Sequence, residues 1–121
     1  EGNDIYPPAK RTLSSHGIAF GEHRAHRITH QEILDADMII VMDHSNVRLA
    51  HRVISSYFSN KEQIKEAESK LHLIMEDFFL PQRDLSLVEE VADPWYTGDF
   101  ERAFSDIYLG CSRLLKHLMG E

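Results

Sequence analysis

The segment with the clearest potential for chemistry is Ala92-Asp93-Pro94-Trp95-Tyr96. Proline disfavours the helical conformation of the residue before it, so we expect Asp93 to be extended and to present its carboxyl group from a loop. Two adjacent large aromatic side chains in a turn are costly to expose unless they cover something or bind a flat group. The segment therefore has two interpretations: a packed turn, or a general acid beside an aromatic pocket lined by Trp95 and Tyr96.

Histidine and cysteine side chains could bind a metal ion or act as a nucleophile. Four histidines lie near the start of the chain, at His16, His23, His26 and His30. Neither cysteine nor carboxylate accompanies them at the spacing of a zinc motif, so we expect no metal site and no cofactor. The single cysteine, Cys111, cannot form an internal disulfide, and its place on an apolar helical stripe favours a structural role.

Two apolar runs predict the strands that position these side chains, at residues 38–42 and 71–75. The first is continuous and rich in β-branched residues, which is typical of a parallel strand covered on both faces. It ends in a polar turn, where Asp43 or Ser45 could cap a following helix. Strands that alternate with helices predict an α/β layered domain with a parallel sheet. Two strands are too few for such a sheet, so we expect others to be missing or supplied by another chain.

Helices are predicted from caps and from apolar side chains at helical spacing. Residues 29–32 have the pattern of a capping box, and residues 99–119 carry one long apolar stripe with an acidic start and a basic end. The polar stretch 60–70 is either an exposed helix or a solvated connection, and residues 76–91 are expected to be irregular. The predicted helices begin near Pro7, Thr29, Asp43 and Asp99.

Composition and charge exclude several classes of protein. The 121 residues suit one domain, and the hydrophobic share of 42% and charged share of 27% are typical of water-soluble globular proteins. A formal charge of −7 argues against nucleic-acid binding. Neither a run of about 20 apolar residues nor a signal peptide is visible, so we expect a cytoplasmic protein that does not enter a membrane.

Four motifs in order along the chain resemble the low-molecular-weight protein tyrosine phosphatase family. The acid loop of that family is similar to Asp93-Pro94-Trp95-Tyr96 and the acidic, aromatic helix start behind it. The three other matches are Gly2-Asn3 with Tyr6-Pro7-Pro8-Ala9, the run His23-Arg24-Ala25-His26-Arg27-Ile28-Thr29, and Met42-Asp43-His44-Ser45-Asn46. His26 stands where the family pattern has arginine. The motifs span nearly the whole chain.

The resemblance implies a fold, a reaction and roles for four side chains. The fold would be an α/β, three-layer domain of the phosphotyrosine phosphatase I type, with a parallel sheet flanked by helices. The reaction would hydrolyse a phosphotyrosine protein or a small aryl phosphate through a phosphocysteine. Asp93 would be the general acid, Trp95 and Tyr96 would line the slot for the phenyl ring, and His23 would support the phosphate loop by hydrogen bonding.

The resemblance also implies a Cys-x5-Arg loop near the family's N-terminus, and this sequence does not contain one. Cys111 cannot substitute, because no glycine-rich loop surrounds it. We therefore interpret residues 1–121 as a single, incomplete low-molecular-weight phosphatase domain whose N-terminal strands are missing. We expect the chain by itself to be inactive.

Three alternatives remain beside that interpretation. An arsenate reductase of the same fold relays electrons through several cysteines, and this chain has one. The chain could be a non-catalytic interaction module that kept the aromatic pocket and lost the chemistry. Two copies could also self-associate by exchanging elements to complete the sheet, since exposed strand edges invite pairing.

Overall fold

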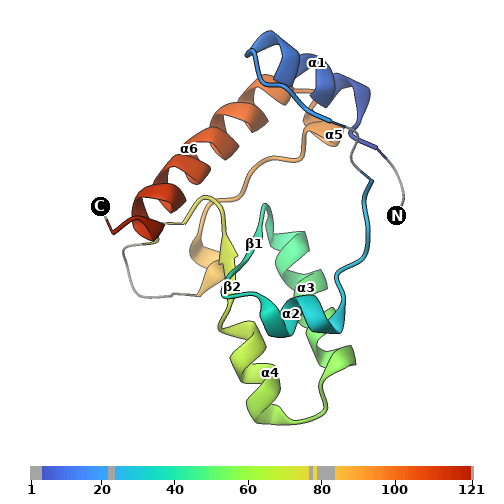
Figure 1. The fold of residues 1–121 in the computed structure, drawn as a ribbon, viewed down its shortest axis with the longest axis vertical. Coiled ribbons are helices and arrows are strands. Elements are labelled where there is room, and N and C mark those ends of the chain that lie inside the picture. Colours follow the sequence, from blue (N-terminus) through green and yellow to red (C-terminus); the bar gives the residue numbers. More distant parts are fainter. Residues whose placement is uncertain (1–3, 22–23, 77, 79–83, 121) are drawn as a thin grey trace.

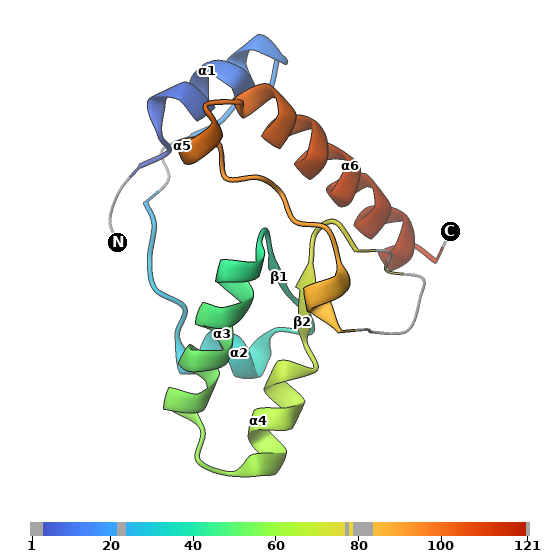
Figure 2. The same ribbon diagram turned by 180° about the vertical axis from the view of Figure 1, so that it is seen from behind.

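The computed structural model describes residues 4–21, 24–76, 78 and 84–120. Helices α2, α3 and α4 lie at one end of the molecule and α1, α5 and α6 at the other, with the two strands between these groups (Figures 1 and 2). No helix in this part of the chain is long and apolar enough to cross a membrane. The elements, in chain order, are α1 (Pro7–Ser15), α2 (His30–Asp35), β1 (Ile39–Val41), α3 (His44–Tyr57), α4 (Lys61–Glu68), β2 (Leu71–Leu73), the 3-10 helix η1 (Leu85–Leu87), α5 (Pro94–Thr97) and α6 (Phe100–Leu118).

Strands β1 and β2 form the predicted parallel pair, with α3 and α4 in the crossover between them. Ile39 lies opposite Leu71, and Val41 lies opposite Leu73. The backbone N–H of Ile74 donates to the carbonyl oxygen of Val41 at 2.9 Å, so the pairing continues just past β2. Each strand is three residues long, which is shorter than the predicted apolar runs. The sheet has two strands within the described residues.

Helices cover both faces of this sheet, as the α/β prediction required. Along β1, Ile39 and Val41 pack against a cluster supplied mainly by α2, α3 and α4, whereas Ile40 packs against a second cluster supplied partly by α6. This alternation follows from the two-residue period of a strand. The buried members are Ile33, Ile54, Phe58, Ala67 and Leu71 in the first cluster, and Ile74, Val91 and Ala103 in the second. The result is three layers.

Side-chain caps start the helices where the sequence predicted them. The Thr29 hydroxyl accepts from the Glu32 N–H at 3.2 Å, and the Glu32 carboxylate accepts from the Thr29 N–H at 2.9 Å, which completes the predicted capping box. Asp43 rather than Ser45 caps α3, because its Oδ1 accepts from the Asn46 N–H at 2.8 Å. The polar stretch 60–70 is largely helical, with Asn60 capping α4. Its structure therefore agrees with the exposed-helix alternative.

Helix α6 approaches the sheet closely through one glycine. A Cβ atom on Gly110 would lie 2.5 Å from the carbonyl oxygen of Ile74 and 2.6 Å from its Cγ1 atom. Real Cβ atoms do not come this close to backbone, so only glycine allows the observed contact between α6 and the end of β2. At its other end α6 packs against α1, where His16 Nε2 lies 2.7 Å from a carboxylate oxygen of Glu101.

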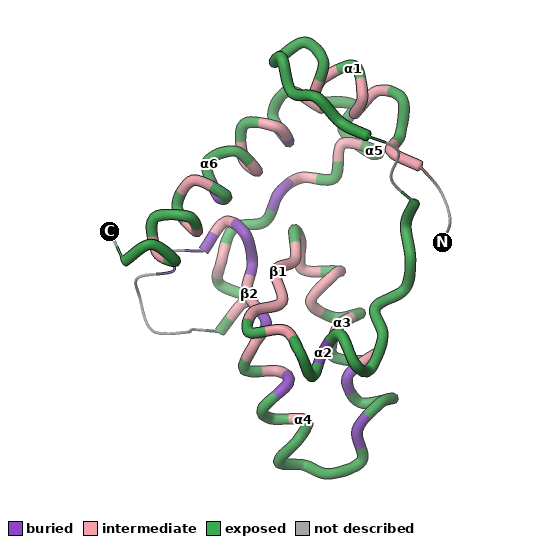
Figure 3. The backbone as a smooth tube through the Cα atoms, viewed as in Figure 1, coloured by how far each residue is buried: buried purple, intermediate pink, exposed green. Residues whose placement is uncertain are grey.

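The apolar stripe of α6 is uncovered toward its C-terminal end. Its buried residues are Ala103 and Gly110, whereas Leu115 and Leu118 are 57% and 64% exposed. In Figure 3, exposed and intermediate stretches alternate along α6. Cys111 lies on the stripe as predicted, but its side chain is exposed. It lines an apolar groove of about 410 Å³ between α1 and α6, together with Ile18, Phe104 and other side chains.

Candidate active site

A backbone hydrogen bond places the segment before Asp93 beside the end of β1. The N–H of Val91 donates to the carbonyl oxygen of Met42 at 2.9 Å, and Met42 directly follows the last residue of that strand. Val91 itself is 3% exposed and belongs to the cluster between the sheet and α6. Asp93, two residues later, therefore lies just beyond the carboxyl end of a parallel strand, which is where open α/β sheets place their ligands.

The first turn of α3 and the segment before Asp93 are also joined by Glu90. Its carboxylate accepts from the backbone N–H of His44 at 2.6 Å, and His44 Nδ1 lies 3.3 Å from the same oxygen. The other ring nitrogen of His44 lies 2.8 Å from the carbonyl oxygen of Val88. A carboxylate at a helix N-terminus is stabilised by the unpaired N–H groups of the first turn. These contacts hold the segment that carries Asp93 against α3.

Asp93 has the extended conformation that the following proline predicted, with φ of −68° and ψ of 114°. Its Oδ1 atom accepts from the backbone N–H of Trp95 at 2.9 Å, so the side chain also caps the single turn of α5. Gly98 ends that turn with φ of 73°, a conformation that strongly favours glycine. The carboxyl group is exposed, and its Oδ2 atom makes no hydrogen bond to any residue that the structure describes.

A small pocket lies in front of the Asp93 carboxyl group. Its volume is about 280 Å³, and Asp43, His44 and Arg48 reach it from the start of α3. Arg48 brings a positive charge beside the acidic side chains of the pocket. The complete lining is Asp43, His44, Ser45, Arg48, Glu90, Val91, Asp93 and Tyr96.

The two aromatic residues after Asp93 point to different surroundings. Tyr96 lines the pocket and is 86% exposed. Trp95 is not among the lining residues, and its ring lies 4.9 Å from the ring of Tyr6, measured between centroids. The structure therefore brings Tyr96 and Asp93 together, whereas Trp95 packs partly against the N-terminal segment. The predicted supporting residue His23 lies outside the described residues.

Six of the eight lining residues were not predicted as site residues from the sequence, namely Asp43, His44, Ser45, Arg48, Glu90 and Val91. His44 and Arg48 are four residues apart at the start of a helix that directly follows a predicted parallel strand. That spacing puts both side chains on one helix face at the sheet's carboxyl edge, so the pattern could have identified them. Glu90 lies in a stretch without periodicity, and no comparable signal marks it.

The histidines considered for metal binding have other neighbours. The ring of His16 stacks on Phe104 with centroids 3.9 Å apart, and His26 Nε2 lies 3.1 Å from a carboxylate oxygen of Glu32. The ring of His30 stacks on Tyr57. No group of three or more His, Cys, Asp and Glu side chains that could hold a metal ion occurs within the described ranges.

Comparison with known proteins extends over the whole chain. The sequence model of the low molecular weight phosphotyrosine protein phosphatase family matches residues 1–121. The chain belongs to this family. The low molecular weight protein-tyrosine-phosphatase YfkJ of Bacillus subtilis is 31% identical over 120 residues, and the low molecular weight phosphotyrosine protein phosphatase of Sus scrofa is 31% identical over 112 residues. The predicted family is thereby confirmed.

The fold of this phosphatase-family chain also matches a solved structure. The low molecular weight protein tyrosine phosphatase SP-PTP of Streptococcus pyogenes superposes with a TM-score of 0.73 at 26% identity, over 97% of this chain and 65% of its own. The match to YfkJ covers 99% of this chain and 68% of the relative. The match to the Sus scrofa protein covers 93% of this chain and 61% of the relative. The chain thus spans about two thirds of the length of these relatives.

Proposed function

We propose that the chain is the acid-donating part of a phosphotyrosine phosphatase domain, in which Asp93 protonates the departing phenol. The observation that carries the proposal is the exposed Asp93 carboxyl group on the wall of a pocket at the carboxyl edge of a parallel sheet. Membership of a phosphotyrosine phosphatase family supports it. The substrate class is then a phosphotyrosine protein or a small aryl phosphate.

The two carboxyl oxygens of Asp93 have different roles in this reaction. Oδ1 is held by the Trp95 N–H, and this bond fixes the direction of the carboxyl group. Oδ2 carries the proton that passes to the phenol oxygen as a cysteine thiolate takes the phosphoryl group. The ionised carboxylate then accepts a proton from the water that attacks the phosphocysteine, which releases phosphate and restores the acid.

The thiolate of this reaction is not provided by the 121 residues. A Cys-x5-Arg motif that began at Cys111 would need arginine at position 117, and the residue there is His117. Cys111 also lies within the long helix α6, whose backbone N–H groups are engaged in the helix and cannot cradle a phosphate. We therefore expect that the chain by itself forms no phosphocysteine.

Hydrolysis of p-nitrophenyl phosphate by the purified 121-residue chain tests this expectation. We expect no turnover that orthovanadate inhibits, whereas YfkJ assayed in parallel serves as the active control. Vanadate-sensitive turnover that disappears in Cys111→Ser would show that the assignment of the nucleophile is wrong.

The role of Asp93 is tested in a fusion of this chain behind a family segment that contains the Cys-x5-Arg loop. Asparagine caps a helix about as well as aspartate, so Asp93→Asn keeps the bond to Trp95 while removing the proton donor. We expect kcat/KM for phenyl phosphate, which reports the steps up to departure of the phenol, to fall by about 10²- to 10⁴-fold. The loss should be much smaller for p-nitrophenyl phosphate, because its leaving group needs less protonation. Equal losses for both substrates would contradict a general-acid role.

The uncovered surface of α6 favours a second candidate, self-association of an interaction module. Leu115 and Leu118 are exposed on one side of α6, beside the apolar groove that α1 forms with this helix. Such a surface suits a second copy of the chain. Sedimentation equilibrium over the micromolar range measures this, and Leu115→Glu should weaken any dimer while the exposed Lys116→Glu should not. A strictly monomeric chain would exclude the candidate.

A further inference from the structure

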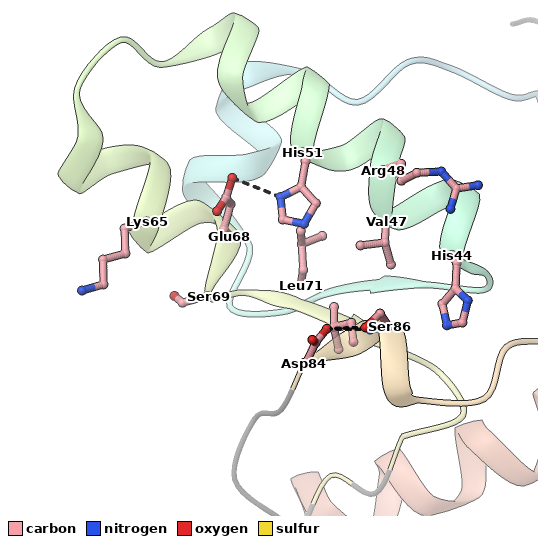
Figure 4. A pocket seen from close by; sticks show the side chains of 11 residues that line it. His44, Val47, Arg48, His51, Lys65, Glu68, Ser69, Leu71, Asp84 and Ser86 are labelled. Atoms are coloured by element: carbon pink, nitrogen blue, oxygen red, sulfur yellow. Dashed lines mark hydrogen bonds and ion pairs between the residues drawn. The ribbon is translucent and has the colours of Figure 1, made fainter.

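A second, larger pocket adjoins the one that contains Asp93. It has a volume of about 570 Å³ and is bounded by α3, α4, the start of β2 and η1. His44 and Arg48 line both pockets, so the two lie side by side along the first turns of α3. Figure 4 shows His44 and Arg48 at one end of this pocket and Lys65 at the other. The proposed reaction uses none of the space between them.

The carboxylates that face this pocket are already engaged. Glu68 Oε1 lies 3.0 Å from His51 Nδ1. Asp84 Oδ1 accepts from the hydroxyl and the backbone N–H of Ser86 at 2.7 and 3.0 Å. The Ser86 hydroxyl, followed by its N–H, holds the pKa of Asp84 below its ordinary value, so this carboxyl group is ionised at neutral pH. Within the described residues neither acid forms an ion pair with the cations at the two ends, although the negative charge of Asp84 remains in the pocket.

Arg48 and Lys65 are the groups left to attract a ligand. Both are exposed, and within the described residues neither side chain forms an ion pair or a hydrogen bond. The chain as a whole carries a formal charge of −7, so most of its surface repels an acidic peptide. A pocket that ends in two unpaired cations is a place where such a peptide gains electrostatic attraction instead.

The dimensions suit a short extended peptide. His44 and His51 are seven residues apart on α3, which corresponds to about 10.5 Å along a helix axis. An extended chain advances about 3.3 Å per residue, so about three residues cover this distance. A peptide whose phosphotyrosine lies beside Asp93 would therefore place its third or fourth neighbour near the far end of the pocket, where Lys65 lies.

We infer that this pocket is a subsite for acidic residues that flank the phosphotyrosine, recognised by Arg48 near the reacting group and by Lys65 three or four residues away. The inference rests on the proposed function for the identity of the substrate. The class of ligand is an acidic phosphotyrosine peptide in extended conformation. Arg48 and Lys65 are specificity-determining residues in this scheme.

The subsite can be tested by binding, without any turnover. The 121-residue chain is titrated, with backbone amide NMR as the readout, against two peptide series in which phosphotyrosine is followed by Glu-Ala-Glu-Glu or preceded by Glu-Glu-Ala-Glu. Matched peptides carry alanine in place of glutamate. We expect the acidic peptide of one series to bind more tightly than its alanine match, with amide shifts concentrated at residues 47–51 and 65–69, and the preference to weaken in high salt.

Matched variants then assign the effect to the two cations. Arg48→Gln and Lys65→Gln should each reduce the preference for the acidic peptide by about two- to fivefold, the range of an exposed ion pair. Arg52→Gln on α3 and Lys61→Gln on α4 remove the same charges from positions that do not line the pocket, and should leave the preference unchanged. Equal effects of pocket and control variants would reduce the result to non-specific attraction and overturn the proposal.

The outcomes separate this inference from the proposed function. Equal affinity for acidic and alanine peptides, or no binding of either at millimolar concentration, would overturn the subsite whatever the fusion protein does with aryl phosphates. A preference that depends on Arg48 and Lys65 would support the subsite. Should the Asp93 tests fail while this preference persists, the pocket stands as an acidic-peptide site and the proposed reaction does not.

Discussion

Replacement of Gly110 by alanine tests the close contact between α6 and the end of β2. Gly110 is buried inside α6, and a Cβ atom there would lie 2.5 Å from the carbonyl oxygen of Ile74. In an uncrowded helix this substitution is stabilising by about 1 kcal/mol, because alanine has the higher helix propensity. The two effects oppose each other, so the sign of the change in unfolding free energy shows which of them is larger.

The magnitude follows from the kind of atom that the new methyl group meets. Overpacking of a well-packed interior costs about 1–3 kcal/mol. The carbonyl oxygen of Ile74 belongs to backbone that hydrogen bonds hold beside β1, so it cannot rotate away as a flexible side chain would. The upper half of that range therefore applies, and after the gain in helix propensity we expect a net loss of about 1–2 kcal/mol.

Urea unfolding followed by circular dichroism measures this loss. With a denaturant dependence of about 1.5 kcal/mol per molar, the midpoint of Gly110→Ala should fall by about 1 M. The control is Ser105→Ala, an exposed position on the same helix, which gains helix propensity without meeting a neighbour and should keep or slightly raise the midpoint. A Gly110→Ala midpoint equal to or above that of the unchanged chain would refute the close packing of α6 on the sheet.

Three further predictions concern the α3 cap, the α2 cap and the exposed thiol. Asp43→Ala should lower the free energy of unfolding, measured by urea titration, by about 1 kcal/mol, because it removes the acceptor for the Asn46 N–H. Asp43→Asn keeps an acceptor oxygen and should retain most of that stability; equal losses in the two variants would show that the cap is not the cause. The hydrogen bond with His26, followed by those from Thr29, holds the pKa of Glu32 below its ordinary value of 4.5. The unfolded state therefore binds more protons below that pH, so the stabilisation is present above 4.5 and is lost as the pH falls through the lower folded pKa. Glu32→Gln keeps the capping-box acceptor and should flatten the dependence of the urea midpoint on pH in this acidic range; an unchanged slope would contradict the assignment. Cys111 should react with Ellman's reagent in the folded chain nearly as fast as in urea because its side chain is exposed, and strong protection at low protein concentration would show that the groove beside it is closed.

Local structure was predictable from the sequence because its causes are short in range. The Thr29 capping box and the start of α3 at Asp43 depend on side chains within four residues of one another. The extended conformation of Asp93 follows from a clash with the ring of the next residue alone. The same holds for the apolar runs of the two strands and for the long stripe of α6. In each case the spacing of apolar residues along the chain indicates which face of the element is apolar.

The surroundings of the acid depended on the tertiary structure. His44 and Glu90 are 46 residues apart, and they meet because the segment before Asp93 bonds to the end of β1. Tyr96 lines the pocket, whereas Trp95 packs on Tyr6, and no local pattern distinguishes the two. They are adjacent aromatic residues in the same turn, and they differ in which distant segment of the chain each one faces. Periodicity likewise could not indicate that the C-terminal part of the α6 stripe is exposed.

The sequence by itself indicated the family, the helix starts and the parallel strands, and it predicted Asp93 as the general acid. The tertiary structure decided what surrounds Asp93: a carboxyl group with one oxygen held by the Trp95 N–H, a pocket shared with Arg48, and a second pocket beside it that extends to Lys65. The physical reason is one of range. Backbone conformation and caps respond to neighbours along the chain, whereas a pocket and its charges arise where segments far apart in sequence are packed together.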